Sequence, residues 1–175
     1  ANIMVLDNGT AKLADFGIAR LEAANSALTQ AGSILGSLLY ISPEQLMNAK
    51  TVDKRADIYS LAVTAYEILT GTLPYNGENI GEIVMKIMNS EPPRLSEINR
   101  QVPVELDGII FKAMAKTADM RYANAKEFKA DINQILLKYT ATGNEPLNLS
   151  MDKTSAGIDS VNIAQDNVPT MMGSS

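Results

Sequence analysis

The sequence predicts a mainly α-helical domain that opens with a short β-hairpin. Three observations lead to this prediction. An Asn-Gly pair separates two short apolar runs near the start, one later segment is apolar around most of a helical circumference, and three further segments carry apolar residues at helical spacing. The 175 residues are 46% apolar and 20% charged, which is the balance of one folded domain.

The first elements are two strands, predicted at residues 3–6 and 11–14 and joined by Asp7-Asn8-Gly9-Thr10. Asn-Gly favours a tight turn between strands because both residues accept positive φ. Residues 18–41 are rich in Ala, Ser, Gly and Thr and show no sustained period, so they predict a long loop. Loops of this length in compact domains usually carry function.

Ser42-Pro43-Glu44-Gln45 is typical of a helix start, with Ser as the N-cap and Pro at the first helical position. The Gln side chain is placed to bind the backbone N–H of Ser, as in a capping box. Residues 57–70 predict a buried central helix, ended by Gly71, because its polar stripe is narrow: Ser60, Thr64 and Glu67.

Three amphipathic helices follow, around residues 80–88, 106–114 and 128–136, which brings the expected number to about five. Asn124 caps the last one, with Glu127 three residues on. From residue 141 to 175 the chain is rich in Thr, Ser and Asn without a period, so we expect a disordered tail or linker after a domain of residues 1–140.

Composition excludes several classes of function. The absence of cysteine and histidine rules out a disulfide framework, a thiolate or imidazole metal site and a Ser-His-Asp triad within these residues. A net charge of -5 without a basic stripe argues against nucleic-acid binding. No apolar run approaches the roughly 20 residues that span a bilayer, so we expect no membrane segment in this chain and a cytoplasmic location.

Asp15-Phe16-Gly17 places a carboxylate directly after a predicted strand. Such an aspartate can hold Mg²⁺ bound to nucleotide phosphates, because Mg²⁺ takes hard oxygen ligands. By itself the tripeptide favours an ordinary turn aspartate over a metal ligand.

The order of several short motifs narrows these alternatives. From the N-terminus they are Asn2-Ile3-Met4-Val5, Asp15-Phe16-Gly17, Gly36-Ser37, Ser42-Pro43-Glu44, Asp57-Ile58-Tyr59-Ser60-Leu61 and Arg121. Together they resemble the C-terminal lobe of eukaryotic-like serine/threonine protein kinases, closest to the bacterial type. The resemblance covers residues 1–139 and implies the C-lobe of the α+β kinase fold.

The resemblance implies ATP and Mg²⁺ as cofactors. Asn2 matches the asparagine that ends the catalytic loop and Asp15 the aspartate that holds the phosphate-bridging metal, so both are expected metal and cofactor ligands. Phe16 and Gly17 would have structural roles: Phe16 would pack as part of the switch between the active and inactive states of the kinase, and Gly17 lets the backbone turn.

Residues 18–41 would then be the activation segment. Thr29 and Ser33 are its expected phosphorylation sites, although each is also compatible with a solvated loop hydroxyl. Gly36 and Ser37 resemble the platform for the substrate residue, and Leu38 stands where the family often has proline.

Three further matches are structural. Glu44 resembles a glutamate that forms a buried ion pair with a late arginine, here Arg121; alternatively it only favours a helix N-terminus. Asp57 resembles the aspartate that braces the catalytic loop, and it is also compatible with a plain N-cap.

Kinase chemistry also needs a glycine-rich flap, a strand lysine and a proton-accepting aspartate. In the family order these precede Asn2, so we expect the chain to begin inside the catalytic loop and the catalytic aspartate to lie upstream of Ala1. The expected function is transfer of the ATP γ-phosphate to Ser or Thr of protein substrates by a parent enzyme, with this chain alone inactive. The parent is further expected to form a kinase dimer, with a membrane anchor outside this chain. The alternative is a pseudokinase-like scaffold that binds a partner.

Overall fold

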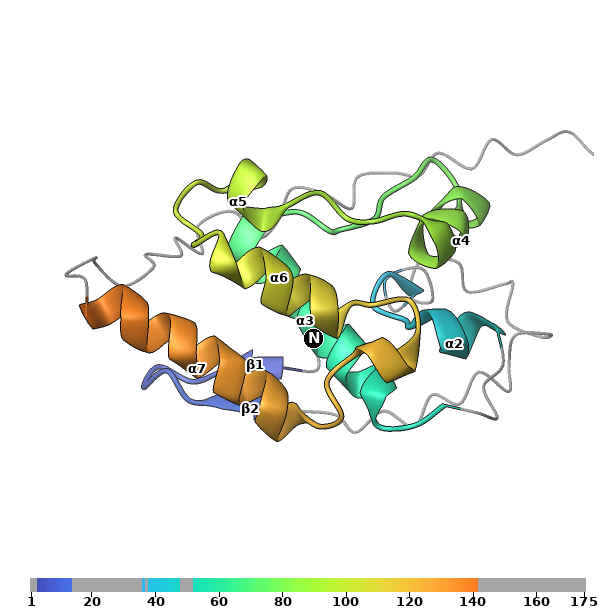
Figure 1. The fold of residues 1–175 in the computed structure, drawn as a ribbon. Coiled ribbons are helices and arrows are strands. Elements are labelled where there is room, and N and C mark those ends of the chain that lie inside the picture. Colours follow the sequence, from blue (N-terminus) through green and yellow to red (C-terminus); the bar gives the residue numbers. More distant parts are fainter. Residues whose placement is uncertain (1–2, 14–35, 37, 48–51, 142–175) are drawn as a thin grey trace, which may run out of the picture.

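The computed structural model describes residues 3–13, 36, 38–47 and 52–141 (Figure 1). Its elements in chain order are β1 (Ile3–Val5), β2 (Ala11–Leu13), α2 (Pro43–Met47), α3 (Arg55–Thr70), α4 (Ile80–Asn89), α5 (Leu95–Ile98), α6 (Glu105–Ala113), the 3-10 helix η3 (Ala118–Met120) and α7 (Ala125–Ala141). The predicted class, a mainly helical body preceded by a hairpin, is confirmed.

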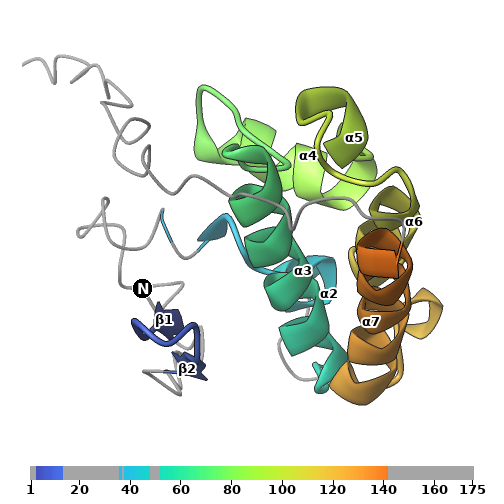
Figure 2. The ribbon, with the colours of Figure 1, turned by 90° about the vertical axis from the view of Figure 1, so that its left-hand side faces the viewer.

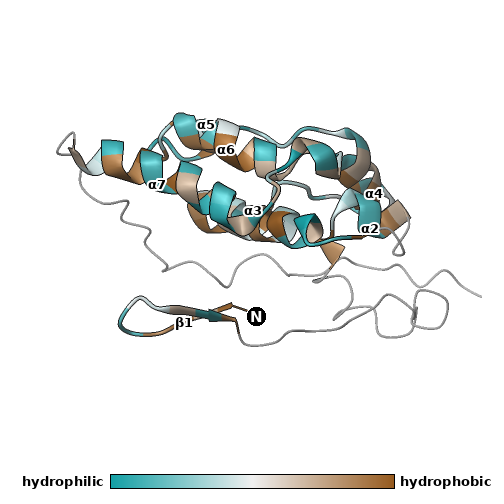
Figure 3. Cartoon of the chain, turned by 60° about the horizontal axis from the view of Figure 1, so that its bottom comes forward, coloured by the Kyte–Doolittle hydropathy of each residue, from teal (hydrophilic) through white to brown (hydrophobic). Residues whose placement is uncertain are grey.

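The two strands pair antiparallel, with Ile3 opposite Leu13 and Val5 opposite Ala11. Gly9 adopts a φ of 78°, the left-handed conformation that the Asn-Gly turn predicts. The turn closes through the Gly9 amide, which donates to the Leu6 oxygen at 2.8 Å. The hairpin lies apart from the helices in both Figure 2 and Figure 3, and most of its side chains are exposed.

Helix α3 is the centre of the helical body, as predicted. It lies against α6 and α5, and α7 covers α6 (Figures 1 and 2). One face of α3 is buried in the core, formed by Ala56, Ile58, Tyr59, Ala62, Val63 and Tyr66. The prediction that the helix is buried around most of its circumference is wrong, because Leu61 and Ile68 are 41% and 47% exposed. Gly71, with a φ of 72°, ends the helix as expected.

The start of α3 also corrects a prediction. The helix begins at Arg55, two residues before Asp57, so Asp57 is an exposed residue of the first turn and no N-cap. Asp53 takes the capping role instead, because its Oδ1 accepts the Arg55 backbone N–H at 2.8 Å. The same carboxylate binds the Arg55 guanidinium.

The remaining amphipathic helices form where the spacing predicts them. Asn79 caps α4, and Asn124 caps α7 by accepting the Glu127 N–H at 3.0 Å, while Glu127 reaches back to the Ala123 N–H. Helix α7 continues to Ala141, beyond its last predicted apolar position. The short helices α5 and η3 were not expected, since each is too short to show a period.

The core gathers where these helices face one another, and Figure 3 shows apolar residues on their inner sides. Its largest fully buried side chains include Tyr59, Tyr66, Ile87, Leu95 and Ile110. Within the described part of the chain, no helix has the length and apolarity needed to cross a membrane.

Candidate functional site

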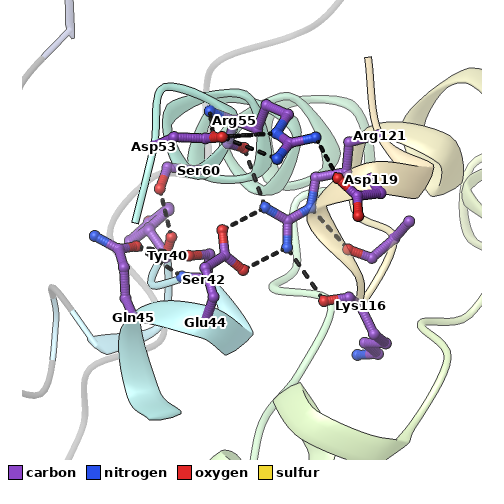
Figure 4. A network of polar contacts seen from close by, with 11 residues as sticks. Tyr40, Ser42, Glu44, Gln45, Asp53, Arg55, Ser60, Lys116, Asp119 and Arg121 are labelled. Atoms are coloured by element: carbon purple, nitrogen blue, oxygen red, sulfur yellow. Dashed lines mark hydrogen bonds and ion pairs between the residues drawn. The ribbon is translucent and has the colours of Figure 1, made fainter. Parts of the chain in front are cut away.

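Glu44 and Arg121 form the ion pair that the sequence predicts, between α2 and the residue that follows η3 (Figure 4). The contact is bidentate, with the two guanidinium nitrogens 2.6 and 2.7 Å from Oε1 and Oε2. The Arg121 side chain is fully buried, and that of Glu44 is 19% exposed. Burial raises the pKa of Glu44, but the hydrogen bonds and charge of Arg121 outweigh it and hold the pKa below its ordinary value.

Arg121 also donates hydrogen bonds to backbone oxygens of two other segments. Its Nε donates to the Ala115 oxygen at 2.8 Å, and a terminal nitrogen donates to the Arg55 oxygen at 3.1 Å. The guanidinium lies 4.9 Å from the centroid of the buried Tyr59 ring. One side chain therefore fastens α2, the start of α3 and the loop after α6 together, which is the arrangement that Figure 4 draws.

The start of α2 is fixed by its own cap. The Gln45 side-chain oxygen accepts both the Ser42 backbone N–H at 3.0 Å and the Ser42 hydroxyl at 2.9 Å. Gln45 thus reaches back as predicted, while the hydroxyl of Ser42 donates rather than caps. This cap holds Glu44 in the first turn of the helix, facing Arg121.

The polar stripe of the central helix has a partner that sequence reasoning missed. Ser60 donates its hydroxyl to the Tyr40 backbone oxygen at 2.7 Å, and the Tyr40 hydroxyl donates to the Glu67 carboxylate at 2.6 Å. Burial raises the pKa of Tyr40, and the bond to Glu67 raises it further. The segment before α2 is therefore tied to α3 at two points. The stripe was the available signal, but it does not say which segment it binds.

Most residues expected to bind the metal or the substrate, to shape the site or to be phosphorylated lie outside the described part of the chain. They are Asn2, Asp15, Phe16, Gly17, Thr29, Ser33 and Ser37. Gly36 is half-buried, with open space where a Cβ would point. Asp57 is exposed, and its side chain forms no hydrogen bond or ion pair with the described residues. The described residues include no cluster of three or more Asp, Glu, His or Cys side chains suited to a metal ion. Of the expected site, the structure thus brings together Glu44 and Arg121.

Lys116 was also missed, because an isolated lysine between two helices carries no pattern. Its ammonium contacts the end of α4 and Tyr75, and Lys116 belongs to the loop whose backbone Arg121 binds.

Comparison with known proteins agrees with this geometry. The model of the protein kinase domain matches residues 1–138. The serine/threonine-protein kinase PknB of Mycolicibacterium smegmatis is 40% identical over 136 residues, which are 77% of this chain and 22% of that protein. PknL of Mycobacterium tuberculosis is 40% identical over 134 residues, 77% of this chain and 33% of PknL. PrkC of Bacillus subtilis is 38% identical over 131 residues, 75% of this chain and 20% of PrkC.

The chain therefore spans a fifth to a third of the length of these relatives. The family model covers most of the chain, and the ion pair between α2 and the late arginine forms as the family resemblance implies. This chain belongs to the protein kinase domain family and is similar to bacterial serine/threonine kinases.

Proposed function

We propose that this chain is the part of an ATP-dependent serine/threonine protein kinase that holds the metal and the protein substrate. The observation that supports the proposal most directly is the Glu44–Arg121 pair in a chain that matches the kinase domain over residues 1–138. The pair fixes α2 to the helical body, and α2 begins six residues after Ser37, the second of the two residues assigned to substrate binding. The proposal includes protein substrates, a cytoplasmic location and the formation of a kinase dimer.

The metal would be held by Asn2 and Asp15, which offer one amide oxygen and one carboxylate. These are the hard donors that Mg²⁺ prefers, and the chemistry it supplies is neutralisation of charge on the ATP phosphates. The register of the hairpin supports a shared site. Ile3 pairs with Leu13. In the sequence, Asn2 comes directly before Ile3 and Asp15 comes two positions after Leu13.

Substrate binding is assigned to Gly36 and Ser37, with Thr29 and Ser33 as regulatory phosphorylation sites. What supports this is the attachment of the next residues to the central helix. Tyr40 is bound at its backbone by Ser60 and at its hydroxyl by Glu67. A segment anchored in this way gives a substrate platform a fixed support, and positioning is a large part of phosphoryl-transfer catalysis.

A chimera tests the function. Residues 1–138 of this chain replace the matching segment of the Bacillus subtilis kinase PrkC, and phosphate transfer from radiolabelled ATP to a basic protein substrate is measured. We expect Mg²⁺-dependent transfer to Ser and Thr. The Asp15→Asn chimera should lose at least about a hundredfold in rate, because the metal loses its carboxylate ligand.

The matched control is Asp7→Asn, which changes a carboxylate in the hairpin turn and should leave the rate unchanged. A folded chimera without transfer, or an Asp15→Asn chimera as active as its parent, would contradict the proposal and favour a scaffold that binds a partner. The same assay on the 175-residue chain alone should give no transfer.

A further inference from the structure

Lys116 lies between α6 and η3, and its side chain reaches the C-terminal end of α4. Its Nζ donates to the backbone oxygen of Ile87 at 2.5 Å and to that of Lys86 at 3.5 Å. It also donates to the Tyr75 hydroxyl at 2.8 Å, 4.3 Å from the centroid of that ring. One ammonium thus joins the segment before α4, the end of α4 and the loop after α6.

The chemistry of a helix end explains why a lysine suits this place. The last four carbonyl groups of a helix lack intrahelical partners and carry the negative end of the helix dipole. The Lys86 oxygen already accepts the Ser90 N–H at 2.9 Å, and Lys116 serves the Ile87 oxygen. Tyr75 is 4% exposed, so the ammonium binds a fixed acceptor rather than a mobile one.

The backbone of the same loop is bound by Arg121. Arg121 donates to the Ala115 oxygen at 2.8 Å and to the Lys116 oxygen at 3.4 Å. The Arg121 guanidinium is in turn held by Glu44 of α2. A continuous series of contacts therefore runs from α2 through the ion pair and the 115–116 backbone to the end of α4.

We propose that Lys116 is a positioning residue that couples the end of α4 to the Glu44–Arg121 ion pair. The last turn of α4 keeps its place through the ammonium, and the ammonium keeps its place through the backbone that Arg121 binds. Burial lowers the pKa of Lys116 to about 8, which agrees with an enclosed ammonium; the charge of Glu91 acts in the opposite direction and that of Arg121 in the same direction. The coupling is a property of the fold and does not depend on the proposed kinase activity.

Hydrogen exchange of the 175-residue chain, resolved by mass spectrometry, tests whether Lys116 holds the last turn of α4 in place. In Lys116→Met the protection of the last turn of α4 should fall about tenfold, the equivalent of one lost charge-assisted hydrogen bond, while the protection of α7 stays unchanged. Lys116→Arg, which keeps a cationic donor, should restore most of the protection. Lys129→Met, a change at an exposed lysine of α7, is the matched control and should change nothing at α4.

A double-mutant cycle tests the coupling. Glu44→Asp keeps the charge but shortens the carboxylate, and it should lower protection at the end of α4 at least about threefold in the wild-type background. In the Lys116→Met background the same change should have no effect on α4. Equal effects in both backgrounds overturn the proposal. An unaltered α4 in Lys116→Met, or a uniform loss over all helices, overturns it as well.

If Lys116→Met does not fold, Tyr75→Phe provides the second test. This variant keeps the buried ring and removes only the hydroxyl that accepts from Lys116. It should lower protection at the end of α4 by a smaller factor, about threefold, with α7 unaffected. Full protection of α4 in Tyr75→Phe, measured after a failed Lys116→Met, overturns the proposal.

Discussion

Glu44 is the residue whose replacement we expect to cost the most stability. Glu44→Gln leaves the Arg121 guanidinium, which has a fully buried side chain, without its counter-charge. Removing one partner of a buried pair costs about 3–5 kcal/mol, and the remaining exposure of Glu44 puts the expected loss near the lower end. Urea unfolding measures it. Glu97→Gln is the control, because Glu97 is exposed and 3.9 Å from Arg94, and it should cost less than about 1 kcal/mol. Similar losses in the two variants would contradict this.

The half-buried Tyr40 and the buried Tyr59 form a contrasting pair for a second prediction. The Tyr40 hydroxyl donates to a carboxylate, whereas the Tyr59 hydroxyl has no hydrogen-bond partner among the described residues. Tyr40→Phe should therefore cost about 1.5–3 kcal/mol, and Tyr59→Phe should be neutral or stabilising, because it removes a buried polar group that makes no bond. Equilibrium unfolding of both variants decides it. A larger loss in Tyr59→Phe than in Tyr40→Phe would be the contrary result.

Single residues were predictable from the sequence where a motif fixes both partners. The Ser42-Pro43-Glu44-Gln45 run predicts the cap within itself, and the family order pairs Glu44 with Arg121 across 77 positions. The bond from Tyr40 to Glu67 could not be predicted, because a polar stripe on a helix is ordinarily a solvated face. Only the fold shows that another segment lies over it.

Among the elements, α7 offers a test of how its first turn is held. Asn124 accepts the Glu127 N–H, so Asn124→Ala should destabilise the chain by about 1 kcal/mol. Asn133→Ala is the matched change at an exposed position on the same helix, and it should be neutral or slightly stabilising because alanine favours helices. Thermal unfolding of both variants measures the difference. Equal shifts in the melting temperature would contradict the capping role.

The elements were predictable in proportion to their length and to the signals at their ends. The hairpin, α2 and α7 each carry turn or cap residues, and α4 and α6 carry a clear apolar period. Helices α5 and η3 have four and three residues, too few for a period. The start of α3 was misplaced because Asp57 resembles a cap, whereas Asp53 makes the bond.

At the scale of the whole molecule, the sequence predicted the central helix α3 but not how much of its surface is buried by other parts of the chain. Apolar periodicity tells which residues prefer burial, and it does not tell whether the chain provides enough neighbours to bury them. Leu61 and Ile68 on α3, and Met4, Val5 and Leu13 on the hairpin, are therefore apolar and exposed. The expected metal ligands Asn2 and Asp15 lie outside the described residues and stay a prediction.

The charge state of buried groups gives the whole molecule a predictable response to alkaline pH. Burial raises the pKa of Tyr66 to about 12, and it raises the pKa of Tyr40, Tyr59, Tyr75 and Tyr122 as well. A tyrosine that ionises near pH 10 when unfolded and later when folded stabilises the fold below that pH. Its contribution is lost as the pH rises through the window between the two values. Stability should therefore fall above about pH 10.

Lys116 acts in the opposite direction and at lower pH. Its pKa is lowered to about 8 in the folded chain, against about 10.4 when unfolded, so between these values the unfolded state binds more protons and stability rises with pH. Guanidinium unfolding from pH 7 to 11.5 should thus show a maximum between about pH 8 and 10. Lys116→Met should remove the rise and leave the later fall, because the tyrosines are unchanged. A wild-type curve that is flat up to pH 10, or an equal rise in Lys116→Met, would show that the ammonium is not enclosed in solution.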